Sequence, residues 1–88
     1  MGHAQNQRIY GISITMHWVE HGPPHFHARY GGAQATIDIR EGAVFEGTLP
    51  PRVLRMTLEW ATLHKDELLD NWELCASHRK PKPIPPLD

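Results

Sequence analysis

Residues 25–39 read HFHARYGGAQATIDI, and this stretch contains the clearest structural pattern of the chain. Apolar and polar residues alternate before the Gly31-Gly32 pair, and the same alternation resumes after it. A period of two is typical of a half-buried β-strand. A glycine pair between two such runs is typical of a hairpin with a type I′ turn, in which both turn residues take positive φ. The sequence therefore predicts an antiparallel hairpin of residues 25–30 and 33–39.

Pairing Tyr30 with Ala33 sets the register of this hairpin. Every inward residue then meets an inward partner, as with Phe26 opposite Ile37, so the register is self-consistent. On the other face, the same register places three polar pairs side by side: Arg29 with Gln34, His27 with Thr36, and His25 with Asp38.

Two further strands are expected beside the hairpin. Residues 12–18 alternate with Ile12, Ile14, Met16 and Trp18 inward, and the loop 20–24 contains Gly22-Pro23-Pro24, which ends the strand. This loop leaves two registers open, with His17 beside His25 or beside His27. After the hairpin, residues 40–42 predict a turn with Gly42 in the left-handed region. A short fourth strand follows, in which Ala43 and Phe45 are expected to point inward.

The second half of the chain predicts helix. Thr48 can cap the first turn, and Pro50-Pro51 is tolerated there. A stripe at helical spacing follows, and one long helix or two helices broken near residues 64–66 both fit it. Its members are Leu54, Leu58, Ala61, Leu68, Trp72 and Cys75, and we expect Trp18, Trp60 and Trp72 to pack in or against the core.

The predicted fold class is α+β: a four-stranded antiparallel β-meander with one face covered by a C-terminal helical segment. The expected organisation is a flexible N-terminus at residues 1–8, a single domain at 9–78 and a proline-rich C-terminal tail at 79–88. In that tail Ile84 and Leu87 can pack against the body.

Composition limits the classes of function. The 88 residues suit one domain, with 40% hydrophobic and 22% charged residues and a net charge of -1. No run is long and apolar enough for a membrane span, and the single cysteine, Cys75, fits a buried thiol in the cytoplasm. Residues 41–78 carry seven acids against three bases, so we expect any nucleic-acid contact elsewhere.

Histidines concentrate in one segment, with His17, His21, His25 and His27 inside eleven residues. Directly opposed residues in a sheet have Cβ atoms about 5 Å apart, so the predicted registers place His17, His25 and Asp38 in a row across three strands. The predicted binding face lies opposite the helical layer. It consists of His17, His25, His27, Arg29 and Asp38.

Three interpretations of this row remain open. Two imidazoles and a carboxylate from His17, His25 and Asp38 suit Zn²⁺ or Fe²⁺, with His27 or His21 as a further ligand. Alternatively, His25 and His27 are catalytic acid and base, with Arg29 binding an anion and Tyr30 nearby, in a metal-independent RNA-cleaving enzyme. In the third interpretation the row is a solvated or partner-covered face on which His25 pairs with Asp38.

The sequence also resembles a family of small bacterial domains of unknown function. The resemblance rests on Tyr10-Gly11-Ile12, on Pro23-Pro24-His25-Phe26-His27-Ala28 with Tyr30-Gly31-Gly32, and on Leu58-Glu59-Trp60-Ala61 with Asn71-Trp72. The segment PPHFHA is the family's hallmark, and Pro23, Pro24, His25, Phe26 and His27 match it residue by residue. The resemblance implies no catalytic residue. It does imply a frequent genetic neighbour, a second small domain, and hence candidate membership of toxin–antitoxin pairs.

We therefore expect a cytoplasmic accessory or binding domain of a toxin–antitoxin-like module, acting through its histidine-containing sheet face. The expected partner is a small protein encoded nearby, with RNA as an alternative and no membrane. An uncovered edge strand also leaves room for a homodimer formed by sheet extension.

Overall fold

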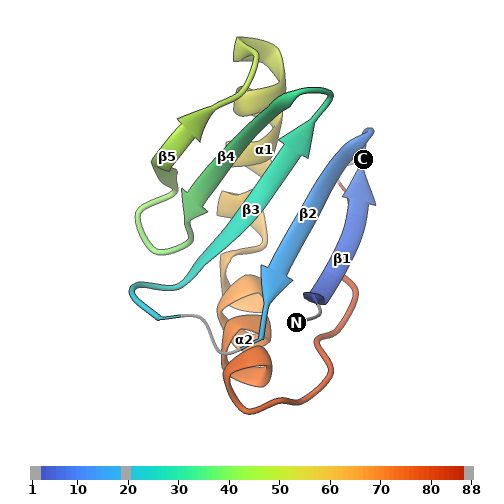
Figure 1. Cartoon of the computed structure of the whole chain (residues 1–88), viewed down its shortest axis with the longest axis vertical. Coiled ribbons are helices and arrows are strands. Elements are labelled where there is room, and N and C mark those ends of the chain that lie inside the picture. Colours follow the sequence, from blue (N-terminus) through green and yellow to red (C-terminus); the bar gives the residue numbers. More distant parts are fainter. Residues whose placement is uncertain (1–2, 19–20, 87–88) are drawn as a thin grey trace.

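A computed structural model of the chain describes residues 3–18 and 21–86, with residues 3–6 described by their backbone alone. Five antiparallel strands form one sheet in the order β1-β2-β3-β4-β5 (Figure 1). Their bounds are β1 His3–Ile9, β2 Ile12–His17, β3 His25–Tyr30, β4 Ala33–Asp38 and β5 Ala43–Thr48. The predicted α+β class is confirmed, but the sheet has five strands rather than four.

Two helices cover one face of the sheet (Figure 1). Of the two alternatives that the sequence left open, the two-helix arrangement is therefore the correct one. Helix α1 spans Pro51–Leu63 and α2 spans Lys65–Ala76, with His64 between them. Helix α1 begins after Pro50, and no side chain caps it. The expected cap, Thr48, instead ends β5. Neither helix is long and apolar enough to cross a membrane.

The predicted β3–β4 register is confirmed along its whole length, from Tyr30↔Ala33 to His25↔Asp38. The turn differs from type I′ because only Gly31 takes a positive φ, of 58°, while Gly32 lies outside the left-handed region. The next turn is as predicted, with Gly42 at a φ of 65°.

One apolar core lies between the sheet and the helices. Eight of the predicted inward residues are buried: Ile12, Ile14, Met16, Phe26, Ala28, Ala35, Ile37 and Ile39. The four C-terminal members of the helical stripe are buried too, while Ala33, Leu54 and Leu58 pack partly against the core. Tyr30, also expected to face the core, is instead 42% exposed at the end of β3. Trp60 and Trp72 are in this core, as expected. Trp18 is not: it is 39% exposed and stacks on His78, because β2 ends one residue earlier.

The added strand, β1, occupies most of the segment expected to be flexible. Its sequence, HAQNQRI, has no apolar alternation, because polar Gln7 pairs in register with Ile14 on the helical side. The Gln7 amide is satisfied by the C-terminal tail: its Nε2 donates to the Ile84 carbonyl, at 2.7 Å, and its Oε1 accepts the Ile84 N–H. Two hydrogen bonds to a residue 77 positions away thus satisfy a polar side chain at a position where a half-buried strand usually carries an apolar one.

The tail over residues 79–86 has no regular structure but is firmly attached. Asn71 of α2 makes two hydrogen bonds with the backbone of Lys82, and Trp60 Nε1 of α1 donates to the Pro85 carbonyl. Ile84 is buried, as expected, whereas Leu87 lies outside the described residues. The tail therefore connects both helices to β1.

Strand β5 departs from the predicted orientation. Its pairing with β4 shifts by one residue, from Thr36↔Glu46 to Ile37↔Val44, so that Phe45 is the extra residue of a bulge. All six β5 residues are exposed, and Phe45 is 63% exposed. The expectation that Ala43 and Phe45 point inward is wrong, since the bulge interrupts the alternation at an edge strand.

Candidate functional site

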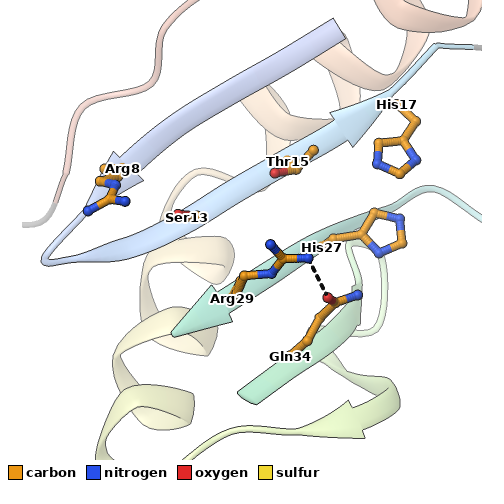
Figure 2. Close-up of a pocket in the computed structure, with 7 residues that line it drawn as sticks. All are labelled: Arg8, Ser13, Thr15, His17, His27, Arg29 and Gln34. Atoms are coloured by element: carbon orange, nitrogen blue, oxygen red, sulfur yellow. Dashed lines mark hydrogen bonds between the residues drawn. The ribbon is translucent and has the colours of Figure 1, made fainter. Parts of the chain in front are cut away.

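The sheet face that points away from the helices carries a pocket of about 450 Å³ (Figure 2). Its lining comes from four neighbouring strands, and every lining side chain is polar. We call it the open-face pocket; it is lined by Arg8, Ser13, Thr15, His17, His27, Arg29 and Gln34.

Strand alternation explains why these side chains share a face. On β2, Ile12, Ile14 and Met16 are buried under the helices, so Ser13, Thr15 and His17 point the other way. The same alternation on β3 buries Phe26 and Ala28 and turns His27 and Arg29 to the open face. The hydrophobic core thus fixes the orientation of the pocket.

The first of two rows crosses the pocket near the β1–β2 and β3–β4 turns. Arg8 pairs with Ser13, Ser13 with Arg29, and Arg29 with Gln34 in the sheet register. Arg29 Nη2 donates to Gln34 Oε1 at 3.2 Å, which holds one guanidinium in place (Figure 2). Two guanidiniums from β1 and β3 therefore flank a serine hydroxyl from the strand between them.

The second row contains the histidines. Thr15 pairs with His27, and the His27 Nδ1 lies 3.3 Å from Thr36 Oγ1, within hydrogen-bonding distance. The ring of His17 stacks on that of His27, with centroids 4.7 Å apart and planes inclined by 25°. His17 thus joins His27 in the pocket, at the opposite end from the two arginines.

His25 and Asp38 are register partners, as predicted, but neither lines the pocket. The ring of His25 lies edge-on to that of His27, with centroids 5.3 Å apart. It also contacts the ring of Trp72 in α2, with centroids 4.9 Å apart. Its Nδ1 lies 2.8 Å from the Pro23 carbonyl oxygen. Asp38 Oδ1 accepts the backbone N–H of Glu41 in the β4–β5 turn. The predicted face is therefore divided: three of its five residues line the pocket, whereas His25 and Asp38 do not.

The metal interpretation gains no support from this arrangement. Within residues 3–18 and 21–86, no three His, Cys, Asp or Glu side chains come together in a group that could hold a metal ion. His21, named as a further ligand, is exposed in the loop before β3. Zn²⁺ and Fe²⁺ sites require several converging ligands, and His17, His25 and Asp38 do not form such a set here.

Four lining residues were not predicted from the sequence: Arg8, Ser13, Thr15 and Gln34. Ser13 and Thr15 share the alternation of His17, and Gln34 faces Arg29 in the predicted register, so a signal was present for these three. Arg8 gave none, because β1 was not expected. The backbone of His3 pairs with that of His17, although residues 1–8 were expected to be flexible.

The chain matches one known protein family over most of its length. The family described as a domain of unknown function, DUF4160, matches residues 11–73. The chain belongs to the DUF4160 family. The DUF4160 match runs from the β1–β2 turn into α2, so it includes six of the seven pocket residues and leaves out Arg8. Comparisons with curated proteins and with solved structures found no match.

Proposed function

We propose that this protein is an accessory binding domain whose contact surface is the open face of its sheet. The observation that carries the proposal is the difference between the two faces. One face is covered by α1, α2 and the tail, whereas the other carries a polar pocket lined from four strands. Converging polar side chains held on rigid strands can fix the position and orientation of a bound group.

The proposed setting is a cytoplasmic toxin–antitoxin-like module. It follows from the resemblance to domains that are encoded beside a second small domain. The proposed partner is the protein encoded by that neighbouring gene, which would cover His17, His27 and Arg29, with RNA as the alternative partner. His25 and Asp38, which are paired on the neighbouring strands β3 and β4, would extend the contact.

Two charge-reversing variants test this proposal. Arg29→Glu changes the pocket, while Arg52→Glu makes the same change on an exposed position of α1. We expect co-purification of the neighbouring gene's product with wild type and Arg52→Glu, and at least a tenfold weaker association, about 1.4 kcal/mol, with Arg29→Glu. Equal association of all three proteins would exclude the open face as the contact surface, provided that their circular dichroism spectra agree.

A second candidate function is metal-independent RNA cleavage by His25 and His27, with Arg29 binding the phosphate. The observation in its favour is that the two imidazoles are in edge-on contact, with centroids 5.3 Å apart. Neighbouring imidazoles can serve as general acid and base at near-neutral pH. The measurement is cleavage of total RNA in the presence of EDTA. Activity lost in His25→Ala and His27→Ala but kept in His64→Ala supports catalysis, and absence of cleavage by wild type rules it out.

A further inference from the structure

The arginine end of the open-face pocket has the chemistry of an anion site. Arg8 and Arg29 lie on β1 and β3, on either side of Ser13 on β2. Neighbouring strands are about 4.8 Å apart, so the two backbones are separated by about 10 Å, and long arginine side chains can converge over Ser13. A guanidinium has five N–H donors, so the single bond from Arg29 to Gln34 leaves donors for a ligand.

The charge of this site is local rather than a property of the whole chain. The chain has a net charge of -1, yet the described residues that line the pocket include two arginines and no carboxylate. The acidic residues of the helices, such as Asp66, Glu67 and Asp70, belong to the layer on the other side of the sheet. An anion at the Arg8–Ser13–Arg29 row is thus attracted by both guanidiniums without an opposing carboxylate in the lining.

The size of the pocket argues for more than a single inorganic anion. Ligand pockets for small molecules span about 300–1,000 Å³, and this one measures about 450 Å³. Along β2, Ser13 and His17 are four residues, or about 13 Å, apart. The stacked rings of His17 and His27 form the aromatic end of the pocket, and imidazole is one of the side chains on which nucleobases stack.

We propose that the open-face pocket binds a nucleotide unit, with its phosphoryl group between Arg8 and Arg29 at Ser13 and its base toward His17 and His27. This inference rests on the proposed function, because it names the ligand chemistry of the same face. The nucleotide unit has two sources: a free mononucleotide or one unit of an RNA strand. Both present the same phosphoryl group and base to the pocket.

Amide chemical-shift titrations with three probes test this assignment: adenosine, 5′-AMP and a single-stranded adenosine hexaribonucleotide. We expect 5′-AMP or the RNA to shift the amides of Ser13, Arg29 and Gln34, and adenosine to bind at least about tenfold more weakly. Saturation by 5′-AMP with an affinity equal to that of the RNA indicates a free nucleotide. An affinity at least about tenfold higher for the RNA indicates a strand.

Matched variants separate a specific site from general attraction of anions. Arg8→Gln and Arg29→Gln each remove one guanidinium, and we expect each to weaken phosphate-dependent binding at least about tenfold. Arg52→Gln removes an exposed guanidinium on α1 and is expected to bind like wild type. Equal losses in all three variants, or no shifts at about 10 mM of either phosphorylated probe, overturn the inference. If partner association still depends on Arg29, only the nucleotide assignment fails and the proposed binding face stands.

Discussion

Gly47 is a position at which strand β5 has no room for a side chain. It lies in β5 with a φ of 84°, and a Cβ there would clash with the Gln34 carbonyl oxygen and lie 3.0 Å from the Ala35 Cα. Gly32, in the β3–β4 turn, has neither constraint, since a Cβ there would meet nothing within 4 Å. The two positions therefore form a matched pair of glycines.

We predict that Gly47→Ala lowers the free energy of unfolding by at least about 2 kcal/mol, because both the left-handed backbone and the steric clash oppose a side chain. Gly32→Ala is expected to change it by less than about 0.5 kcal/mol. Urea unfolding of both variants provides the measurement. Similar values for the two would contradict the close approach of β5 to β4 at this point.

Cys75 links stability to alkaline pH. Its side chain is buried in the core, and burial raises the pKa of the thiol above its ordinary value of 9.0. The unfolded chain therefore loses this proton at a lower pH than the folded chain. The resulting stabilisation is fully present below pH 9.0 and is lost as pH rises through the folded pKa.

We predict that the free energy of unfolding falls more steeply with pH in wild type than in Cys75→Ala once pH exceeds 9.0. Other alkaline groups titrate in both proteins, so the difference between the two profiles isolates the thiol. The measurement is chemical denaturation at a series of pH values from neutral to alkaline. Parallel profiles throughout would show that Cys75 titrates alike in the folded and unfolded chains.

At the scale of elements, the C-terminal tail acts as the third component of the covering layer. It fills the space between the helices and β1 with Ile84, and its backbone satisfies the side chains of Gln7, Trp60 and Asn71. All buried polar side-chain atoms in the described part of the chain have hydrogen-bond partners. Removal of the tail would break the hydrogen bonds that it makes with Gln7, Trp60 and Asn71.

Ile84→Ala is predicted to lower the free energy of unfolding by about 2–4 kcal/mol, as expected for a large-to-small substitution in a core. Lys80→Ala, at an exposed position of the same tail, is the control and should change it by less than about 0.5 kcal/mol. Thermal or urea unfolding compares them. If both substitutions are neutral, the tail does not contribute to the core in solution.

At the scale of the whole molecule, the sheet, both helices and the tail share one core. Residues from β1 to Ile84 belong to a single cluster of buried side chains. A small domain with one core unfolds as a unit. We therefore expect the tryptophan fluorescence of a Trp18→Phe variant, which retains only Trp60 and Trp72 in the helices, and the amide signals of β2 and β3 to give the same urea midpoint. Separate midpoints would show that the helical layer unfolds independently of the sheet.

The sequence by itself determined the parts of the fold that depend on neighbouring residues. Alternation and the Gly31-Gly32 turn predicted β2, β3 and β4 with the correct β3–β4 register, and a stripe at helical spacing predicted the helical layer. The same alternation predicted that His17, His27 and Arg29 point to the open face of the sheet. These features are local, because each is set by residues a few positions apart or across one short turn.

The tertiary structure alone decided the features whose partners lie far away in the chain. Strand β1 pairs with β2 and its Gln7 bonds to Ile84, and with β1 comes Arg8, the second guanidinium of the pocket. The contact of His25 with Trp72 likewise joins β3 to a distant helix and separates this histidine from the pocket lining. Hydrogen bonds and ring contacts between remote segments leave no periodic pattern in a sequence, which is why only the folded chain reveals them.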